Sequence, residues 1–307
     1  MEKNWLVIVN PNAGKRKGEK DWHIIEGLLK SKNITYKSLF TQDKHHAITL
    51  AKENITEEYK NIIVVGGDGT LNEVINGIFL QEKFPTTEIT LGMINVGTGN
   101  DWGRMYDIPQ SYKEAIEVIM NNKTFVQDAG LVKYNNSEGK QSRYFVNMAG
   151  MGFDAQVARR TNKQKEDGKG NTFSYLINIF AALWSHIDKY SEIQIDNHKF
   201  KGKIFSMNVG ICKYNGNGMK QAPNAIPDDG LFDMTIIKKL GKFKVIKNVK
   251  KLYDGSFVKL PEVNTYQGKS ISINSNTKIF LEADGESLGH TPFEFEIVPK
   301  SIKVIVS

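Results

Sequence analysis

A glycine-rich motif, Gly66-Gly67-Asp68-Gly69-Thr70, stands between the apolar run Asn61–Val65 and the helix-like segment Leu71–Leu80. Glycines at a strand-to-helix turn let backbone N–H groups approach an anion, and the start of the helix adds a positive dipole end. Asp68 would then lie near phosphate oxygens, where a carboxylate can hold Mg²⁺. The motif predicts a phosphate site, and the alternative is a tight turn with a helix-capping aspartate.

Two further loops follow strand-like runs in the same way. Asn95-Val96-Gly97-Thr98-Gly99-Asn100-Asp101 comes after Ile89–Ile94, and Asn10-Pro11-Asn12-Ala13-Gly14-Lys15 comes after Trp5–Val9. Ligands of open α/β sheets lie at the carboxyl ends of the strands, so we expect the three loops to line one site. Taken alone, the Asn10–Lys15 loop is a turn and Lys15–Lys20 an exposed charged stretch.

These loops match none of the common nucleotide motifs. The sequence contains no GxxxxGK[ST] P-loop, GGDG is not GxGxxG, and the HRD and DFG triplets of protein kinases do not occur.

Two acidic segments stand in the second half of the chain. Ala283-Asp284-Gly285-Glu286 reads either as a simple Asp-Gly turn or as a carboxylate delivered to a reacting alcohol, whose proton Glu286 could accept. Ala225–Leu231 contains adjacent aspartates, which predict either a hard-cation site with oxygen ligands or an acidic turn before a strand.

The elements that must position these residues change character along the chain. Up to about residue 123, short apolar runs alternate with helical stretches, which is typical of a parallel α/β sheet. Beyond that point alternating strand-like runs dominate, interrupted by helical stretches at Thr172–Ile187 and Lys242–Leu252. We predict an α/β nucleotide-binding domain over residues 1–123 and a larger, β-rich, antiparallel sandwich-like domain over residues 124–307. The last strand could pack back on the first domain, and the active site is expected in the cleft between the domains.

Composition narrows the function class. The 307 residues include 41 Lys and Arg against 34 Asp and Glu, a net charge of +7 that favours anions without choosing among them. No nucleic-acid recognition motif is present, so we expect no nucleic-acid partner. The single cysteine, Cys212, excludes an internal disulfide and cysteine-based zinc clusters. No apolar run reaches the ~18 residues of a membrane span, and the amino-terminal segment does not read as a signal peptide, so a cytoplasmic location is expected.

Taken in order, these segments resemble the diacylglycerol kinase catalytic-domain family, in particular the soluble bacterial lipid kinases, which have an NAD kinase-like fold. The resemblance covers nearly the whole chain. It is carried by Asn10-Pro11 with Gly14, GGDGTLNEVINGI (66–78), LGMINVGTGND (91–101), DDGLFDM (228–234), ADGE (283–286) and the ending PKSIKVIV.

The resemblance implies ATP as nucleotide, Mg²⁺ as cation and a lipid alcohol as acceptor, with diacylglycerol as first choice and phosphatidic acid as product. It implies Glu286 as proton acceptor, with Asp68 and Asp284 as further catalytic residues. Asp68 would lie at the catalytic Mg²⁺, and a second metal site would use the carbonyls of Ile226 and Leu231 with the Asp229 side chain. The residues that it assigns to nucleotide binding are Asn10, Pro11, Asn12, Ala13, Gly14, Thr41, Gly66, Gly67, Asp68, Gly69, Thr70, Leu71, Asn72, Thr98, Asn100 and Asp101.

Some alternatives stay open at this point. The family usually carries Phe and a small residue after GTxND, whereas Trp102-Gly103 stands here, which could reshape the acceptor site. Phosphatidylglycerol or a sphingoid or ceramide-like lipid is an alternative acceptor, and a nucleotide-binding regulatory protein without turnover is an alternative function. A homodimer is also open.

Contact with the inner face of the membrane is expected through the basic segment Arg159–Lys165 and the apolar stretch Thr172–Ile187. The alternative is a solvated loop beside a core helix.

Overall fold

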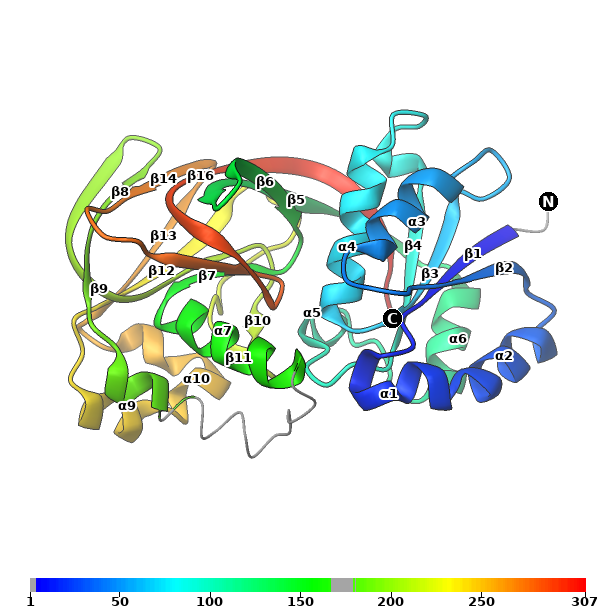
Figure 1. Ribbon diagram of the computed structural model, residues 1–307, viewed down its shortest axis with the longest axis horizontal. Coiled ribbons are helices and arrows are strands. Elements are labelled where there is room, and N and C mark those ends of the chain that lie inside the picture. The colour runs from blue at the N-terminus through cyan, green and yellow to red at the C-terminus, as the bar shows by residue number, and fades with distance from the viewer. Residues whose placement is uncertain (1–3, 167–178, 180) are drawn as a thin grey trace. The chain divides into compact units, whose positions relative to one another are not determined.

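The computed structural model describes residues 4–166, 179 and 181–307, which form two compact units (Figure 1). Unit 1 comprises Met1–Ala129 and Val298–Ser307, and unit 2 comprises Gly130–Ile297. The domain boundary after residue 123 stays a prediction, because compactness alone does not show that either segment folds by itself.

Unit 1 is built on a parallel sheet with the strand order β2-β1-β3-β4, to which the C-terminal end of β16 adds a further parallel strand through Lys303 and Val304. The elements of this unit are β1 (Asn4–Val9), α1 (Ala13–Lys20), α2 (Trp22–Ser31), β2 (Thr35–Phe40), α3 (His46–Asn54), β3 (Asn61–Gly66), α4 (Asp68–Leu80), η1 (Thr86–Glu88), β4 (Thr90–Asn95), α5 (Asp101–Met105) and α6 (Tyr112–Asn121). In the sheet, β2 lies on one side of β1, and the next strand in the chain, β3, lies on the other side. The carboxyl ends of β1 and β3 therefore form a topological switch point, where ligands of such sheets bind.

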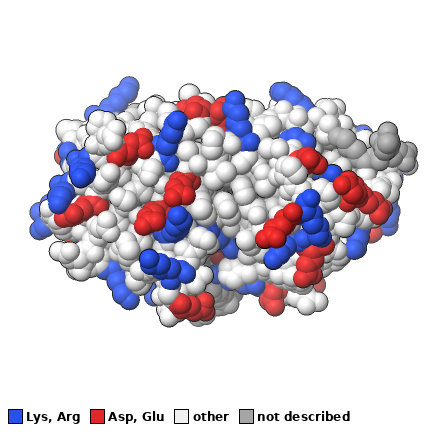
Figure 2. All heavy atoms as spheres, turned by 90° about the horizontal axis from the view of Figure 1, so that it is seen from above, with Lys and Arg blue, Asp and Glu red and all other residues white. Residues whose placement is uncertain are grey.

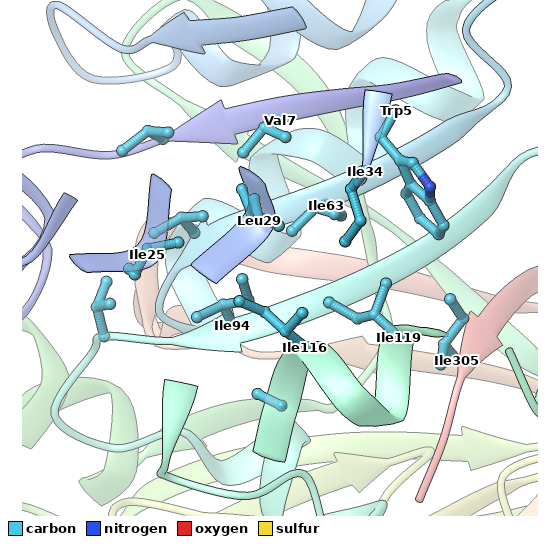
Figure 3. Packing of buried hydrophobic residues seen from close by; sticks show 14 residues of the cluster. Trp5, Val7, Ile25, Leu29, Ile34, Ile63, Ile94, Ile116, Ile119 and Ile305 are labelled. Atoms are coloured by element: carbon cyan, nitrogen blue, oxygen red, sulfur yellow. The ribbon is translucent and has the colours of Figure 1, made fainter. Parts of the chain in front are cut away.

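Strands β1, β3 and β4 are buried on both faces because helices cover both faces of the sheet, whereas the edge strand β2 is partly exposed. Strand residues such as Val7, Ile63 and Ile94 pack against α2 and α6 in a core that Ile305 of β16 joins (Figure 3). The alternate residues of β1 and β3 are also fully buried, and α3 and α4 pack against these strands. The sheet is thus held rigidly from both sides, which fixes the positions of the loops at its strand ends.

Unit 2 is predominantly antiparallel. Its elements are β5 (Thr124–Asn136, which begins in unit 1), β6 (Gly139–Phe145), β7 (Met148–Gly152), α7 (Phe153–Glu166), β8 (Lys189–Ile195), β9 (His198–Gly210), β10 (Tyr214–Asn215), β11 (Met219–Lys220), β12 (Phe232–Lys238), α9 (Lys242–Asn248), α10 (Lys251–Asp254), η2 (Ser256–Lys259), β13 (Val263–Gly268), β14 (Ser270–Asn274), β15 (Phe280–Ala283) and β16 (Glu286–Ile305, which ends in unit 1). Two long strands, β9 and β16, change partners along their length, so that β9, β7, β15, β16, β14 and β8 pair in a ring. Closure of the ring leaves these six strands without an unpaired edge.

Two segments differ from the sequence expectation. The expected turn at Asn10–Lys15 enters a helix at Ala13, and Gly14, Lys15 and Arg16 all have a positive φ, so this first turn is left-handed. The expected helix Lys242–Leu252 is two short helices, α9 and α10. Half of the residues in the expected helix Thr172–Ile187 lie outside the described part of the chain, and of the others residues 179 and 181–185 are helical, as expected.

Charges of both signs share the surface. Figure 2 shows lysine and arginine side chains interspersed with aspartate and glutamate on the face that it displays. Among the helices in the described part of the chain, none combines the length and the apolarity that crossing a membrane requires.

Candidate active site

The three glycine-containing loops of unit 1 meet at the carboxyl ends of β1, β3 and β4, and each loop contacts the other two. A Cβ atom added at Gly97 would lie 2.6 Å from the Cα atom of Gly67, and one added at Gly14 would lie 1.8 Å from the carbonyl oxygen of Val96. The Asn10 Nδ2 atom donates to Thr70 Oγ1 at 2.9 Å. Glycine is needed at these close approaches because any side chain would collide with backbone.

The start of α4 is open to an anion. The residue before the helix is Gly67, in extended conformation, so no side chain caps the first turn. Such a helix start presents N–H groups and a positive dipole end to a phosphate. The side chains of Leu71 and Asn72 are buried at 1% exposure, so these two predicted residues could contribute to the site through their backbone.

Asp68 caps a helix, as the alternative to the phosphate site predicted, but the helix is α5 and not α4, which Asp68 itself begins. Its Oδ2 accepts from the Asp101 N–H and its Oδ1 from the Trp102 N–H, both at 3.1 Å, which caps α5. A Cβ atom at Gly99 would lie 3.2 Å from Asp68 Oδ2 and 3.6 Å from Asp101 Oδ2. Two carboxylates therefore face the same small space beside Gly99, an oxygen-only arrangement that suits a hard cation.

The remaining predicted residues of unit 1 are distributed around the three loops. Thr41, at 6% exposure, follows β2 and donates its N–H to the Val9 carbonyl at 2.9 Å. Thr98 is exposed, and Asn100 Nδ2 donates to the Gly97 carbonyl at 3.0 Å. In the first loop, Pro11 and Ala13 are half-buried and Asn12 is exposed.

Trp102 is a core residue of unit 1. Its side chain is 1% exposed, its Nε1 donates to Gln127 Oε1 at 3.0 Å, and its ring lies 5.0 Å from that of Tyr106. The next residue, Gly103, has no room for a side chain, because a Cβ atom there would lie 2.5 Å from the Asn95 amide nitrogen. The Trp-Gly pair thus belongs to the packing that supports the third loop.

In unit 2, the segment Ala283–Glu286 is the turn of the β15–β16 hairpin. Asp284 and Gly285 have φ values of +48° and +84°, which is the conformation that an Asp-Gly pair favours in a two-residue hairpin turn. The Asp284 carboxylate, at 3% exposure, accepts from the N–H groups of residues 146, 147 and 148 at 2.9, 3.0 and 3.0 Å. The turn is therefore fixed to the chain before β7, and half-buried Glu286 is the first residue of β16.

Sequence reasoning missed a buried carboxylate next to this turn. Glu282, at 2% exposure, accepts from Asn215 Nδ2 at 2.9 Å and from the Gly285 N–H at 3.0 Å. Burial raises the pKa of Glu282 to about 8, and the negative charge of Asp154 adds to this, whereas the bond from Asn215 opposes it. Burial also raises the pKa of Asp154 to about 6, against a hydrogen bond from Ser206. The inward position of Glu282 on β15 depends on strand register, which the sequence does not show.

The predicted second metal ligands lie in one turn before β12. Asp229 is exposed and its Oδ1 accepts from the Leu231 N–H at 3.0 Å, while Ile226 is 51% exposed. Among the described residues, no group of three or more His, Cys, Asp or Glu side chains is placed to hold a metal ion. A site here would therefore depend on backbone carbonyls together with the one carboxylate.

A parallel α/β unit with glycine loops at its switch point, followed by an antiparallel unit, is the architecture of the NAD kinase-like fold class. Residues 4–132 match the diacylglycerol kinase catalytic domain, and residues 147–306 match the YegS C-terminal NAD kinase β sandwich-like domain. The chain belongs to the diacylglycerol kinase family and is a lipid kinase.

Individual relatives agree with this assignment. The chain is 32% identical over 306 residues to a diacylglycerol kinase of Staphylococcus haemolyticus and 31% identical over 306 residues to one of Staphylococcus carnosus. Both alignments cover 99% of this chain, and they cover 88% and 95% of the two relatives, respectively. Among solved structures, a diacylglycerol kinase from Bacillus anthracis has a TM-score of 0.72 at 23% identity, over 100% of this chain and 97% of that chain. Yeast NADH kinase has a TM-score of 0.54 at 10% identity, over 100% of this chain and 84% of that chain. These likenesses confirm the predicted fold class, and the family implies a nucleotide substrate.

The contact between the second and third loops yields a first prediction. Gly97→Ala would push Gly67 away and weaken nucleotide binding, and the overpacking would lower the free energy of unfolding by about 1–3 kcal/mol. Gly27→Ala is the matched control, because a Cβ at this position on α2 has no atom within 4 Å. The Kd of ATP, measured by calorimetry for both variants, should rise for Gly97→Ala only. An unchanged Kd would show that nucleotide binding does not need this close approach.

The raised pKa of Glu282 yields a second prediction. A carboxyl group whose pKa is higher in the folded state stabilises the fold most below its unfolded value, near 4.5, and this stability is lost as the pH rises to about 8. The free energy of unfolding should therefore fall between pH 6 and pH 8, and Glu282→Gln should flatten this fall. Urea unfolding at several pH values measures the slope, with the exposed Glu296→Gln as control. Equal slopes for the wild type and Glu282→Gln would contradict the assignment.

Proposed function

We propose that the protein transfers the γ-phosphate of ATP to the hydroxyl group of diacylglycerol and forms phosphatidic acid. The observation that carries the nucleotide half of this proposal is the mutual contact of the three loops at the switch point. The relatives named diacylglycerol kinases support the choice of acceptor.

ATP binding is assigned to unit 1. The N–H groups at the start of α4 and the third loop would receive the phosphates, because Gly67 and Gly97 keep side chains out of the way. The first loop contributes Asn10, whose bond to Thr70 ties it to the second loop. Lys15 and Arg16, in the left-handed turn that follows, are exposed cations beside this loop.

The residues present fit Mg²⁺. Asp68 and Asp101 would hold one ion beside Gly99, and Asp229 with the carbonyls of Ile226 and Leu231 would hold a second in unit 2. When bound, the first ion supplies charge neutralisation for the phosphates. The Asp68 and Asp101 carboxylates are already oriented by the α5 cap and by Arg104, whose Nε lies 3.9 Å from Asp101 Oδ1.

Glu286 is the proton acceptor in this proposal. The lipid hydroxyl oxygen forms a bond to the γ-phosphorus as the bond to the bridging oxygen of ADP breaks, and Glu286 takes the hydroxyl proton. Asp284 is the residue that positions Glu286, because its three hydrogen bonds to residues 146–148 hold the turn from which β16 starts.

A cavity in unit 2 is lined in part by Ser287, the residue after Glu286, and it suits part of a lipid acceptor. Its volume is about 320 Å³, and it combines apolar with polar walls. The lining residues are Asn136, Ser137, Ala155, Arg159, Phe280, Leu281, Ser287, Leu288, Gly289 and His290. The Arg159 guanidinium lies 4.4 Å from the centre of the Phe280 ring, so a cation and an aromatic face share one wall. Glycerol oxygens could bond to the serines while the start of the acyl chains meets Leu281 and Leu288.

The location at the inner face of a membrane and the homodimer stay predictions. Within the basic segment Arg159–Lys165 that is expected to dock, Arg159 and Arg160 are exposed.

The function itself is tested by transfer of labelled phosphate from ATP to a panel of lipids in mixed micelles. Diacylglycerol should be labelled fastest, and faster labelling of phosphatidylglycerol or a ceramide would reassign the acceptor. ATP turnover with no lipid of the panel labelled would refute phosphate transfer to a lipid hydroxyl group.

Replacement of the proposed base gives a third prediction. Glu286→Gln should lower kcat by about 10²–10⁴-fold, because an amide cannot accept the hydroxyl proton, while the Kd of ATP stays unchanged. Glu294→Gln, at an exposed position on the same strand, serves as control and should keep wild-type turnover. Near-normal turnover of Glu286→Gln would remove Glu286 from the role of base.

Filling the cavity gives a fourth prediction. Leu288→Trp should raise the KM for diacylglycerol and leave the KM for ATP unchanged, because the added ring occupies the cavity in unit 2. Leu80→Trp is the control, since Leu80 is 47% exposed at the end of α4 in unit 1. If the lipid KM does not change, or if both KM values rise together, the cavity is not the acceptor site.

A further inference from the structure

The segment from residue 238 to residue 251 concentrates positive charge. It reads KKLGKFKVIKNVKK, with lysines at positions 238, 239, 242, 244, 247, 250 and 251 and neither aspartate nor glutamate. It contains α9 and the start of α10, which lie next to each other in unit 2 (Figure 1). A basic helix of this kind is attracted to anionic surfaces.

Two of the three apolar side chains in the middle of α9 are turned toward solvent. Phe243 is 83% exposed and Ile246 36% exposed, while the smaller Val245 packs against the core that contains Phe205 and Phe257. Packing within the chain would favour the reverse, with the phenylalanine buried. An exposed ring of this size is unusual unless it serves an interaction.

A neighbouring segment extends the same surface. Trp184 is 60% exposed and Ile187 71% exposed. The Lys242 Nζ atom donates to the Trp184 carbonyl at 2.6 Å and lies 5.7 Å from the centre of its ring, so the start of α9 is tied to Trp184. We call Trp184, Ile187, Lys242, Phe243, Ile246 and Lys247 the docking surface.

Few acidic groups offset the lysines around the docking surface. Glu262 forms an ion pair with Lys244, and Asp254 lies at the far end of α10, where it accepts from the Ser256 N–H. Asp188, the acidic residue after Ile187, is acted on by the charges of both Lys239 and Lys203, and its Oδ1 atom lies 3.8 Å from His186 Nε2. The exposed Lys247 has no acidic partner within 4 Å among the described residues.

We propose that the docking surface seats unit 2 on an anionic lipid bilayer, with the side chains of Phe243, Trp184, Ile187 and Ile246 inserted at the level of the headgroups. Lysines near an anionic leaflet add about 1 kcal/mol each, and inserted apolar area adds to this. The aliphatic side chains favour a bilayer over a nucleic acid, because bases would stack on the aromatic rings but gain little from isoleucine.

The docking surface is linked to the acceptor cavity through α7. Ala155 and Arg159 of this helix line the cavity, while Gln156 and Arg160 both donate to Ser185 Oγ at 2.9 Å, next to Trp184. A lipid acceptor resides in the bilayer, so docking beside α7 would bring the cavity to its substrate. This part of the inference rests on the proposed function, whereas the binding to bilayers does not.

Vesicle co-sedimentation of the full chain tests the proposal. The vesicles contain either phosphatidylcholine alone or phosphatidylcholine with roughly 30% phosphatidylglycerol, whose negative surface potential attracts basic segments. The variants are Phe243→Ala with Trp184→Ala, and Lys242→Glu with Lys247→Glu. The control is Lys199→Glu with Lys269→Glu, which makes the same charge change at exposed positions elsewhere in unit 2.

The wild type should bind the anionic vesicles and not the neutral ones. Both docking variants should weaken this binding about 10-fold or more, and the control should weaken it much less. Turnover of a short-chain diacylglycerol in free solution should stay at the wild-type rate in all variants, which also shows that they are folded. If no acceptor is turned over, the proposed function fails while the vesicle result still decides the docking.

Two outcomes would overturn the proposal. One is equal loss of vesicle binding in the control and the lysine variant, with no effect of the aromatic variant, which would indicate diffuse charge attraction. The other is tighter binding of double-stranded DNA than of anionic vesicles through the same lysines, which would assign the surface to nucleic acid.

Discussion

The candidate active site depends on one close approach, between the backbones of Gly67 and Gly97. The Cα atom of Gly67 would lie only 2.6 Å from a Cβ atom at Gly97, so the loops after β3 and β4 can touch only because both residues lack side chains. This contact sets the position of Asp68, whose carboxylate then reaches the N–H groups that begin α5. Capping of α5 in turn orders the third loop, and the bond from Asn10 to Thr70 adds the first loop. A phosphate site thus arises from backbone geometry, with few side chains aimed at the ligand.

In unit 2, buried hydrogen bonds rather than glycine contacts fix the position of the candidate catalytic residue Glu286. Its catalytic candidate stands at a hairpin turn, and hairpin turns are mobile unless they are tied down. Here two buried carboxylates hold the turn: Asp284 accepts three backbone N–H groups, and Glu282 accepts the Gly285 N–H and the Asn215 amide. Burial of charge is costly unless hydrogen bonds compensate, and the raised pKa of Glu282 shows that compensation is incomplete there. Such a cost is common where a polar network orients a functional group.

A lipid acceptor would explain two features of unit 2, a cavity and an exposed basic helix, that folding alone does not require. A cavity with apolar and polar walls and a lysine-rich helix with an outward phenylalanine both occur in unit 2, on either side of α7. An enzyme whose acceptor resides in a bilayer needs a way to approach that bilayer and a place to receive the lipid. The net charge of +7, which could not be assigned from composition, is concentrated in part in the 14 residues from 238 to 251.

The α/β and β-rich halves, the three glycine loops and the family could all be predicted from the sequence. This was possible because buried parallel strands have apolar sequences, and glycine is needed where a backbone approaches another too closely for a Cβ atom. The roles of the carboxylates became visible only in the folded chain. Asp68 caps α5 rather than its own helix, and Glu282 is buried although the sequence drew no attention to it. Trp102 packs into unit 1, and Phe243 points outward. The reason is physical: helix and strand patterns are set by neighbours in sequence, whereas the burial and the hydrogen-bond partners of a side chain are set by residues that are distant in sequence, and strand register and helix docking bring those together.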